Sequence, residues 1–153
     1  MTVSFECVTP SPRSASDMFD LARNIDVHTA SQSDSGERAT SGVTGGLIGL
    51  GETVTWKARH FGLSLSLTSR VTEFDAPHRF VDEQTRGPFS SFRHEHVFEP
   101  ALSGSDSGSG SVMTDRVQFT APFGLLGRMV ERLVLKRYLT RLIEERGRYL
   151  AGR

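Results

Sequence analysis

Residues 113–150 read MTDRVQFTAPFGLLGRMVERLVLKRYLTRLIEERGRYL, and the spacing of the apolar residues changes within this stretch. Up to Phe119, apolar and polar residues alternate, which is the period of a strand with one buried face. Thr-Ala-Pro at 120–122 can begin a helix, and from there to Leu150 apolar residues recur every three or four positions. We therefore predict a final strand over 112–119 and then a C-terminal helix of about 28 residues, roughly 40 Å long.

The predicted helix over 123–150 carries apolar side chains around much of its circumference rather than along one narrow stripe. They are Leu126, Met129, Val130, Leu133, Val134, Tyr138, Leu142, Ile143 and Tyr149. Because an apolar surface of this width must be covered, the helix needs a concave partner. A curved β-sheet is such a partner.

The segments upstream of this stretch supply the strands of that sheet. Strand character bounded by turn signals is found from Val3 and over 37–43, 52–60, 63–74, 79–86 and 90–99. We expect Pro10 and Pro12 to stop the first strand, and Ser14 or Ser16 to cap a short helix that follows. The order strand, short helical region, about six antiparallel strands and long helix predicts an α+β fold.

The composition is that of a soluble globular domain. The chain has 153 residues, 37% of them hydrophobic and 24% charged, which suits a single domain over 1–153. Eighteen basic residues balance eighteen acidic ones, so no overall charge draws the protein to nucleic acid.

The single Cys7 excludes an internal disulfide and fits a reducing compartment. No export signal or run of about 20 apolar residues is present, so we predict a cytoplasmic protein without stable membrane insertion.

Two glycine-rich stretches are interpreted as loops. Gly45, Gly46, Gly49 and Gly51 match neither a phosphate-binding loop ending in Gly-Lys-Ser/Thr nor a dinucleotide fingerprint, so a hairpin connection is favoured. The run SGSDSGSGS at 103–111 has no apolar residue to bury, and we predict that it is a flexible loop.

Strand alternation places two histidines and an aspartate on the inner face of the sheet. His94 and His96 share a face with Phe92 and Phe98, and in the last strand Asp115 shares a face with Met113, Val117 and Phe119. If these two strands pair in a symmetric antiparallel register, His96 lies opposite Asp115. In the preceding strand Phe80, Asp82, Gln84 and Arg86 share a face, but charge appears on both faces of that strand.

Buried polar groups must pair with one another, with water or with a ligand. One interpretation is a satisfied network in which His96 pairs with Asp115 and His94 with Gln84. The other is a site that contacts a ligand or catalyses a reaction. His94 and His96, with Asp115 as a possible third ligand, lack a further ligand for a metal, so no metal site is predicted.

Four motifs resemble the SRPBCC superfamily, also called START/Bet v1-like. They are SPRSASDMFDLARNID at 11–26, GLGETVTWKARHFG at 49–62, FVDEQTRGPFSSFRHEHVFEP at 80–100 and the 113–150 stretch. The resemblance covers nearly the whole chain and is specifically to small bacterial proteins described as polyketide cyclase/dehydrase-like or coenzyme-Q-binding-like. It implies the helix-grip fold, in which a curved antiparallel sheet of six to seven strands grips a long C-terminal helix around an apolar cavity. Relatives bind lipids, isoprenoid quinones, polyketides or hormones, and some catalyse ring closure or dehydration, so the fold alone does not choose a function.

Three functions follow from this interpretation. The first is the binding of a small hydrophobic molecule, with no cofactor. Its predicted contacts are Trp56, Leu63, Leu65, Leu67, Gln84, Phe92, His94, His96, Phe98, Asp115, Val117, Phe119, Met129 and Leu133. The second is a cyclase or dehydratase in which Asp115 orients His96 as the base. The third is an adaptor that touches a partner protein or a membrane surface through the basic flank Arg128, Arg132 and Lys136 of the helix.

Overall fold

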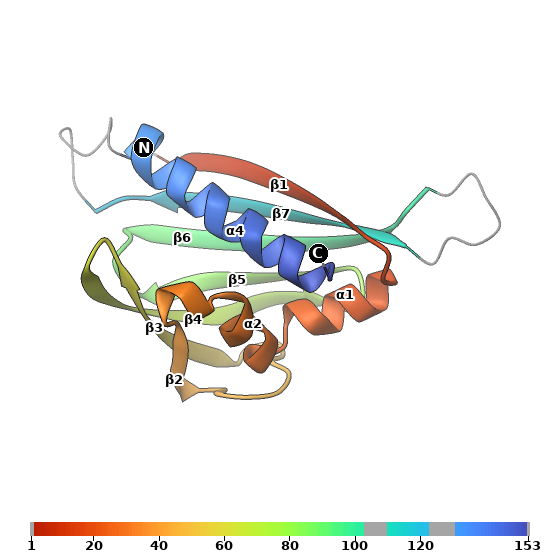
Figure 1. Cartoon of the computed structure of the whole chain (residues 1–153). Coiled ribbons are helices and arrows are strands. Elements are labelled where there is room, and N and C mark those ends of the chain that lie inside the picture. The colour runs from red at the N-terminus through yellow and green to blue at the C-terminus, as the bar shows by residue number, and fades with distance from the viewer. Residues whose placement is uncertain (1, 103–109, 123–130, 153) are drawn as a thin grey trace.

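The computed structural model describes residues 2–102, 110–122 and 131–152 (Figure 1). In chain order the elements are β1 (Val3–Ser11), α1 (Ala15–Ala22), α2 (Ile25–Ser31), the short 3₁₀ turn η1 (Ser33–Ser35), β2 (Arg38–Gly42), β3 (Thr53–His60), β4 (Leu63–Asp75), β5 (Arg79–Arg86), β6 (Ser91–Pro100), β7 (Ser111–Thr120), the π-helical turn η2 (Glu131–Leu135) and α4 (Lys136–Leu150). Within the described residues, no helix is long and apolar enough to span a bilayer.

The seven strands form one antiparallel sheet in the order β1-β7-β6-β5-β4-β3-β2. Consecutive strands from β2 to β7 are neighbours, and β1 joins the sheet beside β7. Figure 1 shows α4 crossing one face of the sheet, with α1 near the C-terminal end of α4. The prediction of a sheet of six to seven strands around a C-terminal helix is confirmed, with the short helices after the first strand.

The first strand extends past Pro10, one of the two prolines that we expected to end it. β1 continues through Pro10, which lies opposite Val112 of β7, and ends at Ser11. The prediction that Pro10 stops the strand is therefore wrong. Because β1 is an edge strand, a proline can leave its missing N–H on the side that has no neighbour. Cys7 of the same strand is buried.

The predicted short helix is divided into two. The Ser14 side chain caps α1 by accepting a hydrogen bond from the Asp17 N–H at 3.1 Å, as one of the two predicted caps. Asn24 then caps a second helix, and its side chain accepts from the N–H groups of Asp26 and Val27 at 3.0 and 3.1 Å. Ile25 therefore begins α2 instead of continuing α1, because the cap residue itself has an extended backbone.

The glycine-rich stretch between β2 and β3 is a hairpin connection, as predicted, since these strands pair antiparallel. Two of its backbone N–H groups are occupied by carboxylates of the same chain. The Gly46 N–H donates to Asp26 Oδ2 at 2.9 Å, and the Gly49 N–H donates to Glu52 Oε2 at 2.7 Å. These amides consequently do not form a free phosphate cradle.

The C-terminal helix is described from the π-helical turn η2 onward. Residues 123–130, where we predict the first turns, lie outside the described residues, as does most of the predicted 103–111 loop.

In α4, Gly147 packs against Thr9 of β1 without space for a side chain. A Cβ atom at Gly147 would lie 2.3 Å from Thr9 Oγ1 and 3.3 Å from Thr9 Cβ.

We expect Gly147→Ala to destabilise the protein by about 1–2 kcal/mol, because overpacking against Thr9 outweighs the roughly 1 kcal/mol that alanine gains as a helix former. Urea unfolding of the purified variant measures this change. In a Thr9→Ala background, which lacks Oγ1, the cost of Gly147→Ala should be smaller. Equal costs in both backgrounds would contradict a steric origin.

Candidate functional site

Two adjoining cavities lie between the inner face of the sheet and α4. The larger, of about 210 Å³, has a mostly apolar wall that includes Ala58, Leu65, Leu67, Phe89, Phe92 and Leu135. The smaller, of about 150 Å³, is bounded by more polar groups, among them Asn24, Gln32, Asp82, His96 and Arg146. Trp56, His94 and Leu142 belong to the walls of both cavities. The cavities therefore adjoin one another, with an apolar end and a polar end.

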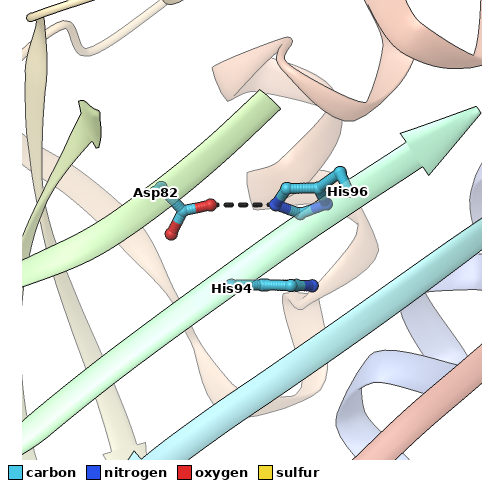
Figure 2. Close-up of side chains that lie close together, drawn as sticks. All are labelled: Asp82, His94 and His96. Carbon is cyan, nitrogen blue, oxygen red and sulfur yellow. Dashed lines mark hydrogen bonds and ion pairs between the residues drawn. The ribbon is translucent and has the colours of Figure 1, made fainter. Parts of the chain in front are cut away.

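The polar end contains four interacting side chains, Asp82, His94, His96 and Asp115, here called the His–Asp cluster. His94 and His96 are two residues apart on β6, so both project to the inner face. The register places Asp82 of β5 opposite His94, and Asp115 of β7 opposite His96. The predicted pairing of His96 with Asp115 is thus confirmed. Figure 2 shows the Asp82 carboxylate directed at the His96 ring, with the His94 ring beside it.

Each histidine is hydrogen-bonded to the carboxylate that lies opposite the other histidine in the sheet. His94 Nε2 donates to Asp115 Oδ1 at 2.8 Å, and His96 Nε2 donates to Asp82 Oδ2 at 2.8 Å. His96 Nδ1 lies 3.0 Å from the same Asp115 oxygen. Asp115 is fully buried, whereas 23% of the Asp82 side chain is exposed. One carboxylate is therefore behind both histidines, and the other reaches the cavity.

The predicted pairing of His94 with Gln84 is wrong. Gln84 Nε2 donates to the Phe89 carbonyl oxygen at 2.8 Å, and the Phe89 N–H donates back to Gln84 Oε1 at 3.3 Å. Gln84 lies close to the end of β5, where the backbone of the turn into β6 needs hydrogen-bond partners. His94 instead donates a hydrogen bond to the carboxylate of Asp115.

Burial and mutual contacts together set the pKa values of the cluster. Burial alone would raise the pKa of Asp115, but the contacts with His94 and His96 outweigh it and hold that pKa below its ordinary range. The His96 hydrogen bond likewise lowers the pKa of Asp82 against the effect of burial. Burial opposes charge on His96, yet contacts with Asp115 and Asp82 raise its pKa. For His94, burial and then the neighbouring His96 lower the pKa. The pKa values of the two neighbouring histidines are thus shifted in opposite directions.

Arg146 joins the cluster from α4, a contact that sequence reasoning missed. Its side chain is 3% exposed, Nη2 donates to the Ala22 carbonyl oxygen at 2.7 Å, and Nη1 lies 3.6 Å from Asp115 Oδ1. Arg146 is therefore buried, unlike the other basic residues of α4, which are exposed: Lys136, Arg137, Arg141 and Arg148. Its helical spacing from Leu139, Leu142 and Ile143, which line the cavities, is the signal that could have placed it inward.

A second polar pair, His28 and Glu37, lies on the wall of both cavities. The His28 ring stacks on Trp56 with 4.2 Å between the ring centroids, and His28 Nε2 pairs with Glu37 Oε1. Neither residue carries a local pattern that predicts this position, because α2 and the segment before β2 are brought together only by the fold.

The predicted contacts among the described residues fall into three groups. Trp56, Leu65, Leu67, Phe92, His94 and His96 line the cavities. Gln84, Phe98, Asp115, Val117 and Phe119 are absent from both cavity walls; the last four are buried behind them, and Gln84 closes a turn. Leu63, the first residue of β4, and Leu133, in the π-helical turn, are 63% and 67% exposed, so they face solvent and do not line a cavity wall. Met129 lies outside the described residues.

Comparison with known proteins gives structural matches only. No family model matches the chain, and no curated protein does. The Thermus thermophilus protein TTHA0849 has a TM-score of 0.78 and 13% identity, covering 98% of this chain and 95% of that one. KanY has a TM-score of 0.73 and 18% identity over 99% and 97%. Ginseng (Panax ginseng) major latex-like protein 151 has a TM-score of 0.64 and 13% identity over 99% and 96%.

These solved structures are Bet v1-like proteins, and identities this low carry information on the fold alone. Their overlap with nearly the whole chain agrees with the sheet order and with the position of α4. The chain has the helix-grip fold of Bet v1-like proteins, in agreement with its resemblance to the SRPBCC superfamily.

Proposed function

We propose that this protein binds a small, largely apolar molecule of the lipid, isoprenoid quinone or polyketide kind in the cavities between the sheet and α4. The observation that carries the proposal is the wall of the larger cavity, where leucine and phenylalanine side chains surround about 210 Å³ that no described side chain fills. Ligand sites are typically apolar clefts with a few polar groups that fix orientation. The smaller cavity supplies those polar groups.

The carboxylates on the wall of the larger cavity favour a neutral ligand with a hydroxyl or carbonyl group. Asp82 and Glu37 both line the larger cavity with carboxylates, and His94 lies beside them. A ligand carboxylate would meet these like charges in a partly desolvated space, which is costly. A phenolic hydroxyl can instead donate a hydrogen bond to Asp82. We therefore expect selectivity for neutral ring compounds over fatty-acid anions.

Three probes test this selectivity, namely 1-naphthol, menadione and decanoate. We expect the two neutral probes to raise the melting temperature by about 5–10 °C at roughly one hundred times Kd, which corresponds to about 2.7 kcal/mol. Decanoate should have a smaller effect. Trp56 is the only tryptophan and lines both cavities, so menadione should also quench the intrinsic fluorescence.

Two phenylalanine variants of β4 form a matched pair for this test. Leu65→Phe fills part of the larger cavity, whereas Leu63→Phe adds the same group two residues away at an exposed position. We expect at least about tenfold weaker 1-naphthol binding in Leu65→Phe, because lost space excludes the ligand. Binding in Leu63→Phe should match the unmodified protein. The proposal fails if no probe shifts the melting temperature, or if both variants bind equally.

Two further functions, catalysis and docking, remain predictions from the sequence. Catalysis with His96 as base and Asp115 as its orienting partner stays a prediction; in the structure both His96 nitrogens face carboxylates, whereas His94 lines both cavities. Docking through the basic flank stays a prediction as well. Arg128 and the Arg132 side chain lie outside the described part of the chain, and Lys136 is exposed.

A further inference from the structure

The chain contains a group of three metal-ligating side chains at the polar end of the cavities. One ring nitrogen each from His94 and His96 and one carboxylate oxygen of Asp82 lie within 4.8 Å of one another. Figure 2 shows these side chains gathered from two neighbouring strands. Ligand atoms around a tetrahedral ion with bonds of about 2.0–2.1 Å are separated by roughly 3.4 Å, so small side-chain rotations are enough to close the site.

The buried carboxylate of Asp115 contacts both imidazole rings. Its Oδ1 lies 2.8 Å from His94 Nε2 and 3.0 Å from His96 Nδ1. The second ring nitrogen of His94 is Nδ1, and the second ring nitrogen of His96 is Nε2, which lies 2.8 Å from Asp82 Oδ2, an oxygen of the third proposed ligand. Histidines that bind metals almost always hold their other nitrogen against a carboxylate or carbonyl in this manner. One buried carboxylate thus orients two ligands at once.

The third ligand and the open side of the group face the smaller cavity. Asp82, His94 and His96 all line it, and the Asp82 side chain is 23% exposed while the two histidines are buried. Three protein ligands beside an open space are the arrangement of metal sites that bind a water molecule or a ligand oxygen in the remaining position. A site with two imidazoles and one carboxylate suits zinc and neighbouring transition metals.

We propose that Asp82, His94 and His96 bind a divalent transition-metal ion of the zinc class, with Asp115 as the residue that positions both histidines. The open coordination position faces the cavity, where a hydroxyl or carbonyl oxygen of a bound molecule has access to the ion. The sequence did not predict this site, because the third ligand that it suggested was Asp115 and not Asp82. Metal binding is independent of the proposed organic ligand and is tested without it.

Cobalt(II) is the probe for this site, since a four- or five-coordinate cobalt ion absorbs visible light much more strongly than a six-coordinate one. Untagged, chelator-treated protein is titrated with cobalt chloride. We expect intense visible bands that saturate at one ion per chain and disappear when Zn²⁺ is added. Weak bands that do not saturate indicate adventitious binding and would overturn the proposal.

Two variants of β5 localise the ion. Asp82→Asn removes the partly exposed ligand, whereas Glu83→Gln changes the adjacent carboxylate on the opposite face, where it pairs with Arg93 at 3.9 Å. We expect cobalt binding to be at least about tenfold weaker in Asp82→Asn, as is found when groups around metal sites are altered, and to be unchanged in Glu83→Gln. Equal affinities in the two variants would refute the assignment.

If Asp82→Asn changes the stability of the metal-free protein, the metal site can still be tested by the change in melting temperature that Zn²⁺ causes in each variant. Zn²⁺ should raise the melting temperature of the unmodified protein and of Glu83→Gln, but not that of Asp82→Asn, because only an intact site binds the ion in the folded state. Menadione binding is measured on the same samples. Retained menadione binding without any metal response would remove this inference and leave the ligand proposal intact.

Discussion

Asp115→Asn is expected to destabilise the protein by about 3–5 kcal/mol, which is the usual cost of breaking a buried ion pair by removing one partner. The Asp115 side chain is fully buried, and its carboxylate lies within 3.0 Å of nitrogens from both His94 and His96. Arg146 Nη1 lies 3.6 Å from the same oxygen. The amide keeps the shape but not the charge, so the buried cationic groups lose the anion that stabilises them.

Urea unfolding followed by circular dichroism measures this effect, and the melting temperature should fall by about 6–20 °C for a chain of this length. Glu99→Gln is the control, since Glu99 is an exposed carboxylate near the end of β6. Its removal should change stability by no more than about 0.5 kcal/mol. Equal stability of the two variants would mean that Asp115 is not the anion on which the cluster depends.

Phe19→Ala is expected to cost about 3–5 kcal/mol as well, for a different reason. The Phe19 side chain is 2% exposed and lies at the centre of an aromatic group. Its ring makes edge contacts with Phe74, Phe80 and Phe98 at centroid distances of 5.4, 5.6 and 5.5 Å. Removing it leaves a cavity that three rings from the sheet cannot fill without moving.

The loss should extend to the His–Asp cluster, because Phe80 stacks on the His96 ring at 4.2 Å. We expect Phe19→Leu to recover part of the stability, since it restores part of the lost volume. Leu50→Ala, at a residue that is 62% exposed, provides the surface control. If Phe19→Ala were no more costly than Leu50→Ala, the contacts of α1 with the sheet would not be essential to the core.

The elements of the fold could be predicted because their signals are local. The alternation in β6 and β7 put His94, His96 and Asp115 on one face, and the antiparallel register then set His96 opposite Asp115. β5 was harder to interpret, since Phe80 and Val81 are both buried although they project to opposite faces. Without one clear buried face, alternation could not show that Asp82 points at His96.

The C-terminal helix illustrates the same limit. Its periodicity predicted a helix that must be covered, but did not show on which side of the helix Arg146 lies. Only the packing of α4 against the sheet shows Arg146 turned inward to the Ala22 carbonyl and toward Asp115. A charge on an apolar helix face has a defined partner only when another element supplies one.

Local periodicity by itself therefore determined the strands, the inner faces of β6 and β7, and the C-terminal helix, because each depends on neighbours within a few residues. Tertiary structure decided which carboxylate each histidine contacts, where Gln84 and Arg146 find partners, and that space remains between the sheet and α4. These features depend on distances between residues far apart in the chain. Differences of about an ångström in those distances separate a filled core from a cavity, and a hydrogen bond from none.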